Sequence, residues 1–317
     1  MAKTHRLSLQ RIAQAATIID PVFLNSPQYL ADSLDSRLGC RVVVKVETLN
    51  PIRSFKGRGA DYLVATLERR RHLVCATAGN FGQGMAYAAR KREFPITVFA
   101  GVNANPLKLD RMRALGADVR LADDVDAAYE AAEAFAAQHQ ALLVTDGRDP
   151  AIGEGAGTIG LELLRWPDPF DAILVPVGDG SLLAGIARWV KAHHPATQMI
   201  GVCAQGAPAM ERSWRAGRVL ELERADTIAD GLALREPFPE ALTDLTGLVD
   251  DMVLVDDATM VDAMRLALRE LGIVLEPSGA ASLAAALAYP QRLEGQLVGA
   301  VLSGGNVTKE QMQRWFT

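Results

Sequence analysis

Cysteine is scarce in this sequence and long apolar runs are missing, and each of these features argues against a class of protein. The 317 residues include three cysteines, Cys40, Cys75 and Cys203, an odd number at wide spacing that excludes a disulfide framework. Their apolar surroundings instead predict buried packing thiols in a reducing compartment. No apolar run approaches the roughly 20 residues that cross a bilayer, and segment 1–6 has no apolar core or cleavage site. We therefore expect a cytoplasmic protein.

Positive charge and histidine are also scarce. Lysine and arginine number 33 against 38 aspartates and glutamates, so the net charge is −5 and nucleic acid is not expected as a partner. The histidines lie outside the glycine-rich loops described below, which argues against a histidine metal cage or a Ser-His-Asp arrangement. They are His5, His72, His139, His193 and His194. We assign the adjacent pair to a solvated helix end, with a metal-binding role as the alternative.

What the sequence has in quantity is apolar residues, which make up 49% of the chain and can fill a large core. Short β-branched runs alternate with stretches whose apolar residues recur at helical spacing, such as 126–138 and 258–271. This alternation predicts an α/β fold with buried parallel strands. The expected strands are 42–46, 73–76, 96–100, 141–144, 172–177, 199–202 and 298–302.

These strands are too many for one compact sheet to be certain, so we expect two lobes around a cleft. The small domain should span 46–149, and the large domain should comprise 1–45 plus 150–317. The turn-rich segment 146–150 is a candidate crossing between them.

Lys56 lies between a polar turn and the start of an apolar-periodic helix. A lysine packed against aromatic and backbone walls loses hydration, which lowers its pKa and leaves a neutral amine able to attack a carbonyl. The alternative is a solvated lysine at a helix start.

Three further loops follow predicted strands, at the sheet edge where α/β proteins bind ligands. The loop 77–84 carries Asn80 and opens a helix, and 178–182 has the glycines and helix start that favour a dianion. The second loop is neither a dinucleotide fingerprint nor a Walker loop. The C-terminal loop 303–306 is preceded by 275–280 at another helix start. Each could instead be an ordinary turn, cap or strand end.

Taken in order, these segments resemble the fold-type II pyridoxal-phosphate enzymes over nearly the whole chain. The resemblance is closest to the serine/threonine dehydratase (ammonia-lyase) and serine racemase branch. It implies a two-lobed fold like the tryptophan synthase β subunit, a cofactor held mainly by the large domain, an active site in the cleft and a homodimer. The matching segments are 54–60, 78–84, 178–182, 276–280 and 303–306.

The resemblance also implies roles for single residues. Lys56 would carry pyridoxal 5′-phosphate as a Schiff base and remove the Cα proton, and Asn80 would bond the phenolic oxygen. Ser303 would face the ring nitrogen, where a neutral hydroxyl favours elimination over transamination. The other expected cofactor contacts are Phe55, Gly178, Asp179, Gly180, Ser181, Leu182, Gly231 and Glu276. The expected substrate contacts are Arg53, Ser54, Thr77, Ala78, Gly79, Asn80 and Phe81.

Several positions depart from the family pattern. Ala78 stands where racemases have a proton-transferring serine, which favours a lyase. Asp179 and Ser181 replace glycines, and an aspartate beside a phosphate dianion is repulsive unless its side chain turns away. Cys203 stands where metal-dependent members have a glutamate, so we expect no divalent cation there.

Two more departures bear on substrate choice. Arg53 replaces a glycine and Phe81 replaces a histidine of the threonine dehydratases. If Arg53 points inward, it could bind an anionic side chain such as that of 3-hydroxyaspartate. The alternative is a solvated loop charge.

The resemblance therefore predicts elimination of water from a β-hydroxy amino acid, giving a 2-oxo acid and ammonia. A β-replacement enzyme, such as a threonine or cysteine synthase, or an amino-acid racemase on the same fold is the alternative. A catalytically silent ligand-binding relative is the non-enzymatic alternative. We expect no regulatory module after Asn306.

Overall fold

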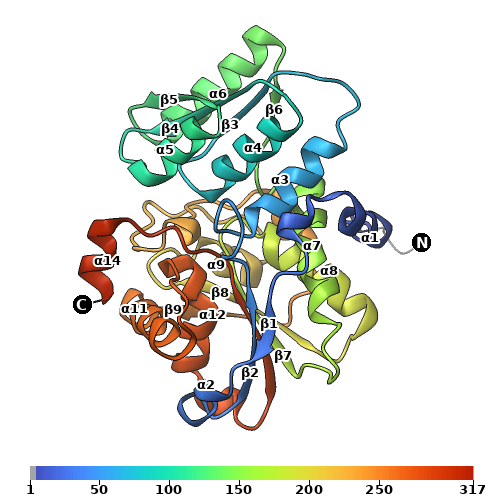
Figure 1. Cartoon of the computed structure of the whole chain (residues 1–317), viewed down its shortest axis with the longest axis vertical. Helices are drawn as coiled ribbons and strands as arrows, with labels where there is room; N and C mark the ends of the chain where they lie inside the picture. The colour runs from blue at the N-terminus through green and yellow to red at the C-terminus, as the bar shows by residue number, and fades with distance from the viewer. Residues whose placement is uncertain (1–4, 317) are drawn as a thin grey trace.

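The protein is an α/β structure built on two separate sheets, as seen in a computed structural model that describes residues 5–316. The smaller sheet and its helices form the upper part in Figure 1, and the larger sheet forms the lower part. The predicted fold class, mostly parallel sheets flanked by helices, is confirmed.

The larger sheet has six strands in the order β1-β2-β10-β7-β8-β9. All its neighbours run parallel except β1, which pairs antiparallel with β2. Its strands are β1 (Gln28–Leu30), β2 (Arg41–Val46), β7 (Ala172–Pro176), β8 (Gln198–Ala204), β9 (Asp251–Val255) and β10 (Leu297–Leu302).

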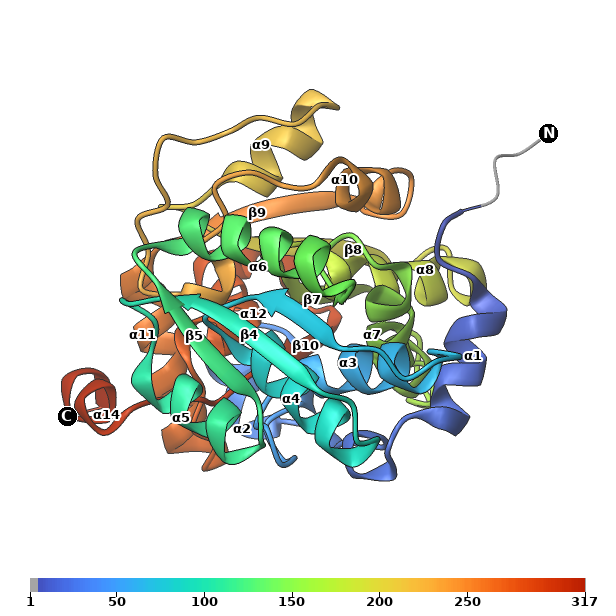
Figure 2. The same ribbon diagram turned by 90° about the horizontal axis from the view of Figure 1, so that it is seen from above.

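The smaller sheet has four parallel strands in the order β5-β4-β3-β6. Its strands are β3 (Leu73–Ala76), β4 (Ile96–Gly101), β5 (Asp118–Ala122) and β6 (Leu142–Leu143). Figure 2 shows α6 (Val125–His139) on one face of this sheet and α4 (Asn80–Lys91) and α5 (Pro106–Ala114) on the other.

The remaining helices cover the larger sheet or join the two sheets. They are α1 (Leu9–Ile18), α2 (Asp32–Leu38), α3 (Lys56–Ala65), α7 (Pro150–Leu163), α8 (Ser181–His193), α9 (Ala209–Ala216), α10 (Pro239–Leu245), α11 (Asp257–Leu266), α12 (Pro277–Ala288), α13 (Pro290–Leu293) and α14 (Lys309–Phe316). Short helical turns lie at η1 (Pro21–Phe23), η2 (Asp230–Leu232) and η3 (Ala267–Leu271).

Apolar side chains fill both faces of the larger sheet, which explains why its central strands are near-continuous apolar runs. One cluster joins these strands to α2, α11 and α12, and a second joins them to α7 and α8. The helices α7 and α8 cross closely at a glycine: a Cβ on Gly185 would lie 2.0 Å from the carbonyl oxygen of Gly153. A side chain at position 185 would therefore force this helix pair apart.

All seven expected strands and both expected helices are present, with 141–144 reduced to the two residues of β6. The strands that the sequence did not indicate are β1, β5 and β9. Each lies at an edge of its sheet, where one side of the strand has no strand partner and apolar runs are shorter.

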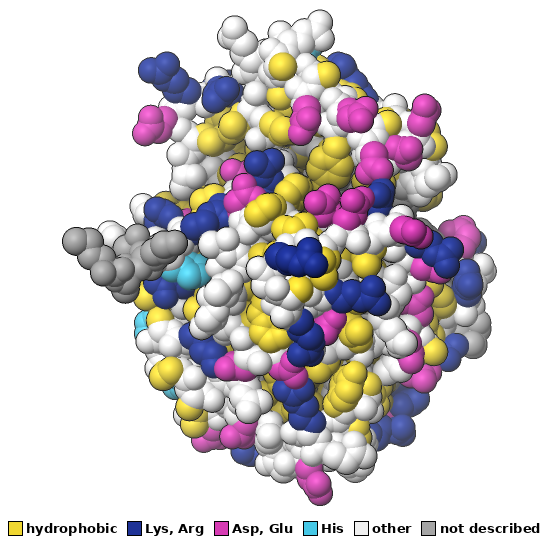
Figure 3. Space-filling view, turned by 180° about the vertical axis from the view of Figure 1, so that it is seen from behind, with side chains coloured by type: hydrophobic (Ala, Val, Ile, Leu, Met, Phe, Trp, Pro, Cys, Tyr) yellow, Lys and Arg dark blue, Asp and Glu magenta, His cyan; other side chains and the backbone are white. Residues whose placement is uncertain are grey.

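The buried position predicted for the cysteines is confirmed. Cys40, Cys75 and Cys203 are buried free thiols, and burial raises the pKa of Cys203 to about 12. Acidic and basic side chains are interspersed over the rear face (Figure 3). Within residues 5–316, no helix is long and apolar enough to cross a membrane.

Candidate active site

A pocket of about 420 Å³ lies between the two sheets, a volume suited to a small ligand. The loops that follow β3, β7 and β10 reach it, as does the end of β4, because the carboxyl ends of parallel strands lie on the same edge of a sheet. The sequence-predicted residues that line it are Phe55, Lys56, Thr77, Ala78, Gly79, Asn80, Phe81, Gly178, Asp179, Gly180, Leu182, Gly231, Glu276 and Ser303.

Lys56 begins α3, and its amine reaches two carboxylates. Its Nζ lies 2.5 Å from Oδ2 of Asp146 and 3.2 Å from Oδ2 of Asp179. Burial by itself lowers the pKa of Lys56, but the charges of these aspartates outweigh it and raise that pKa. The prediction that the pKa of Lys56 is lowered is therefore wrong. No motif in the sequence indicated that Asp146 would lie beside this lysine.

The loop 178–182 forms a cradle at the start of α8. Gly180 has a φ of 96°, in the left-handed region that favours glycine, and no described side chain caps this helix. A Cβ on Gly178 would lie 2.3 Å from the carbonyl oxygen of Gly231, so the two loops touch backbone to backbone. Uncapped amides at a helix start bind phosphate well, and these residues fit the phosphate group of pyridoxal phosphate.

The side chain of Asp179, within this cradle, faces Lys56, whose Nζ lies 3.3 and 3.2 Å from its two Oδ atoms. Its pKa is raised to about 6, because the carboxyl is desolvated and lies beside the charge of Asp146. Asp146 is better satisfied than Asp179: its Oδ1 accepts hydrogen bonds from Ser181 Oγ (2.8 Å) and from the N–H of Gly147 (3.0 Å).

Asn80 links the two sheets through a buried polar cluster. Its Nδ2 donates to Oε1 of Glu276 at 2.5 Å, and its Oδ1 accepts from Nδ2 of Asn306 at 2.8 Å. Nζ of Lys108, from α5, lies 3.2 Å from Oε2 of Glu276 and 2.6 Å from Oδ2 of Asp230. Burial lowers the pKa of Lys108, but the two acids outweigh it and raise that pKa. The cluster thus connects α4 and α5 of the small sheet to the start of α12.

The start of α4 faces the pocket beside this cluster. Thr77, Ala78, Gly79 and Phe81 line the pocket, and no described side chain caps α4 at Gly79. Free amides at the start of a helix bind a carboxylate for the same reason that they bind phosphate. Ser303, at the end of β10, lies on the larger-sheet side of the pocket.

Three predicted contacts are not brought into the pocket. Arg53 is exposed and does not line it, although its carbonyl oxygen accepts from the N–H of Gly305 at 3.0 Å. Ser54 is buried, and its Oγ accepts from the N–H of Lys56 at 3.4 Å. The hydroxyl of Ser181 is engaged with Asp146 instead of facing the pocket. The expectation that these residues contact the cofactor or the substrate stays a prediction.

Other pocket residues were not identified from the sequence. They include Asp146, Lys108, Tyr129, Asp230 and Ser278. Ser278 lies within the motif 276–280, and Asp146 lies in the turn 146–150 after a predicted strand. The position of each could therefore have identified it as a candidate site residue. Lys108 and Tyr129 lie on the helices α5 and α6, where nothing in the pattern separates them from surface residues.

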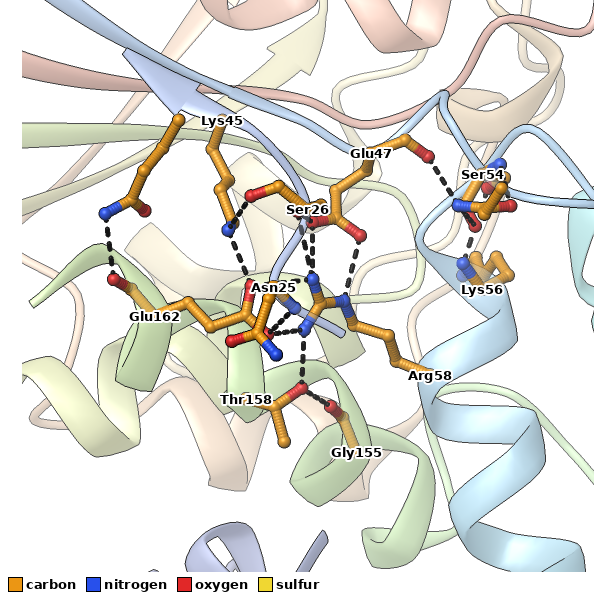
Figure 4. A network of polar contacts seen from close by, with 12 residues as sticks. Asn25, Ser26, Lys45, Glu47, Ser54, Lys56, Arg58, Gly155, Thr158 and Glu162 are labelled. Carbon is orange, nitrogen blue, oxygen red and sulfur yellow. Dashed lines mark hydrogen bonds and ion pairs between the residues drawn. The ribbon is translucent and has the colours of Figure 1, made fainter. Parts of the chain in front are cut away.

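A buried charge network fixes the helix that carries Lys56 (Figure 4). Arg58 is fully buried, and its guanidinium bonds Glu47, the residue after β2, at 2.8 and 2.9 Å and Glu162 of α7 at 2.6 and 2.9 Å. Lys45 approaches Glu162 at 2.6 Å. Since Arg58 lies two residues after Lys56, the network anchors the start of α3 to the larger sheet.

Comparison with known proteins identifies the class that this fold and pocket define. The family model described as pyridoxal-phosphate dependent enzyme matches residues 19–304. The chain belongs to this family and uses pyridoxal phosphate as its cofactor.

The relatives narrow the class further. The chain is 34% identical to an L-threonine ammonia-lyase of Thermotoga maritima over 312 residues, which are 97% of this chain and 78% of the relative. It is 31% identical to an L-threo-3-hydroxyaspartate ammonia-lyase of a Pseudomonas species, with 96% of each chain covered. A crystal structure of the T.th. threonine deaminase has a TM-score of 0.90 and 36% identity, covering 95% of this chain and 99% of that one. The prediction of a pyridoxal-phosphate-dependent lyase of the dehydratase type is confirmed by these similarities.

Proposed function

We propose that the protein removes water from a β-hydroxy amino acid of the serine/threonine class and releases a 2-oxo acid and ammonia. The observation that carries this proposal is the position of Lys56 in a pocket flanked by two uncapped helix starts. The start of α8 suits the cofactor phosphate, and the start of α4 suits the substrate carboxylate. Relatives that bear the name ammonia-lyase support the same reaction.

The residues of the pocket have separate roles in this reaction. When bound, pyridoxal phosphate delocalises the negative charge that develops at Cα. The amine of Lys56 removes the Cα proton as a general base. The amides at 77–81 would hold the substrate carboxylate, Ser303 would bind the ring nitrogen of the cofactor and Asn80 would bind its phenolic oxygen. The β-hydroxyl leaves as water, and hydrolysis of the resulting enamine yields the 2-oxo acid and ammonia.

A screen of 2-oxo acid release with serine, threonine and 3-hydroxyaspartate tests the reaction. We expect release with at least one of them and a matching amount of ammonia. Consumption of a thiol or another nucleophile without 2-oxo acid release would instead identify a β-replacement enzyme.

Ala78→Ser tests the preference for a lyase. Ala78 lines the pocket and its methyl group cannot transfer a proton, whereas a serine hydroxyl there can. We expect conversion of L-serine to D-serine to rise on the order of 10²-fold, the effect of one added acid–base group. Chiral chromatography of the product measures it, with Ala78→Gly as the control that adds no hydroxyl. Equal D-serine formation by both variants would remove position 78 from the choice of reaction.

Arg53→Ala tests whether this charge selects the substrate. Because the Arg53 side chain is exposed and does not line the pocket, we expect the ratio of kcat/KM for 3-hydroxyaspartate to that for serine to change by less than about threefold. A selective loss of 3-hydroxyaspartate turnover would show that Arg53 turns inward in the enzyme–substrate complex.

The cellular location, the oligomeric state and the domain boundaries are also part of this proposal. We place the protein in the cytoplasm as a homodimer, and we keep the division into a small domain at 46–149 and a large domain at 1–45 plus 150–317. The separate sheets, one containing β3 to β6 and the other the remaining strands, support this division.

A further inference from the structure

The charge around Lys56 is unusual for a site that binds a phosphate dianion. Asp146 and Asp179 both reach the amine of Lys56, so one positive charge faces two negative ones before any ligand arrives. Asp179 belongs to the cradle 178–182, and Ser181 of the same cradle bonds Asp146. A bound phosphate therefore adds its charge beside two carboxyl groups.

We propose that Asp146 and Asp179 form a proton-accepting carboxyl pair in the phosphate site, and that Asp179 takes up one proton when the phosphate group of the cofactor binds. This inference rests on the proposed cofactor site at Lys56. The step adds one proton from solvent to an Oδ atom of Asp179 and breaks no other bond. The resulting O–H donates a hydrogen bond to a phosphate oxygen, so a repulsive contact becomes an attractive one.

The hydrogen bonds decide which aspartate holds the proton. Asp146 accepts hydrogen bonds from Ser181 and Gly147 and lies 2.5 Å from Nζ of Lys56, so it has three partners. Within residues 5–316, the side chain of Asp179 accepts hydrogen bonds from Lys56 alone, at 3.2 and 3.3 Å. Burial and the charge of Asp146 already raise the pKa of Asp179 to about 6, and a phosphate dianion raises it further.

The other titratable groups that face this pair do not compete for the proton. Before the cofactor binds, Lys56 of α3 is an ammonium, since its pKa is raised. Burial and the charges of Asp179 and Asp146 raise the pKa of Tyr129, on α6, to about 12. Burial and the charge of Asp146 likewise raise the pKa of Cys75, near the end of β3, to about 12. Of Lys56, Tyr129, Cys75 and Asp179, Asp179 is the group whose pKa lies near neutral pH.

The consequence is cofactor affinity that depends on pH. Above about pH 7 the pH exceeds the pKa of Asp179 in the free protein, so each bound cofactor takes up one proton and the Kd rises up to about tenfold per pH unit. Below the pKa of Asp179 in the free protein, the proton is already present and the dependence fades. The Ser181 and Gly147 contacts are expected to persist in both states.

Calorimetric titration of the cofactor-free protein with pyridoxal 5′-phosphate tests this inference. Titrations at pH 8 in buffers of different ionisation enthalpy count the protons taken up, and the absorbance of the lysine-bound cofactor reports binding independently. We expect close to one more proton for wild type than for Asp179→Asn, and a Kd of Asp179→Asn that changes less than about threefold between pH 7 and pH 8. Asp123→Asn, at an exposed acid, should match wild type.

Unphosphorylated pyridoxal is the matched ligand, because it offers Lys56 the same aldehyde without the phosphate. With pyridoxal, wild type and Asp179→Asn should take up equal numbers of protons. Equal uptake by the two proteins with pyridoxal 5′-phosphate would overturn the inference while leaving the cofactor site intact. Absence of the lysine-bound absorbance in wild type would instead refute the cofactor site itself. If Asp179→Asn does not fold, Asp179→Gly supplies the same comparison.

Discussion

Lys56→Ala is expected to abolish 2-oxo acid release, with a loss on the order of 10³-fold or more in kcat. The variant lacks both the amine that links the cofactor and the base that removes the Cα proton. It should also lack the absorbance of the lysine-bound cofactor. The fold should persist, because the anchor of α3 is Arg58 and not Lys56. Lys309→Ala, at an exposed lysine of α14, is the matched control and should keep full activity.

Added amines provide a second test of the role of Lys56. Methylamine or ethylamine supplied to Lys56→Ala replaces the missing base from solution and is expected to restore part of the turnover. Full turnover by Lys56→Ala without added amine would contradict the assignment of Lys56.

Arg58→Met is expected to lower the free energy of unfolding by about 3–5 kcal/mol, the cost of leaving buried carboxylates without their partner. Glu47 and Glu162 are both buried and would lose the guanidinium that now joins them. Urea unfolding measures the loss. The matched control is Arg113→Met, whose exposed ion pair with Asp110 should contribute less than about 1 kcal/mol. Equal losses in the two variants would show that the network does not stabilise the fold.

The same network predicts how stability depends on pH. Burial by itself raises the pKa of Glu162, but Arg58 and Lys45 outweigh it and lower that pKa to about 2. A depressed pKa in the folded state means that the stabilisation is complete above the unfolded value near 4.5 and is lost as the pH falls towards 2. Wild type should therefore lose more stability than Arg58→Met between pH 5 and pH 3.

The central strands could be predicted from the sequence because they are buried on both faces. The run 42–46 is β-branched and apolar apart from Lys45, and the charge of Lys45 is buried against Glu162. The edge strand β5 has exposed and half-buried residues along its whole length, so no apolar run marked it. Its pairing with β4 depends on the tertiary structure and not on local pattern.

The residues of the candidate site also divide into those that the sequence predicted and those that it did not. Lys56, Asn80 and the cradle 178–182 follow strands and lie in or beside glycine-rich motifs, and all of them except Ser181 line one pocket. Asp146 carries no motif, and its meeting with Lys56 depends on the crossing from β6 to α7. The pKa of Lys56 is therefore shifted opposite to the local prediction, because a charge distant in sequence outweighs the effect of burial.

Borohydride reduction of the holoenzyme, followed by protease digestion and mass spectrometry, directly tests whether Lys56 bears the cofactor. Reduction makes the link between the cofactor and its lysine permanent, so the peptide that bears the cofactor identifies the residue. We expect one modified peptide, with the added mass on Lys56. Modification of Lys108 or of a surface lysine, with Lys56 unmodified, would contradict it.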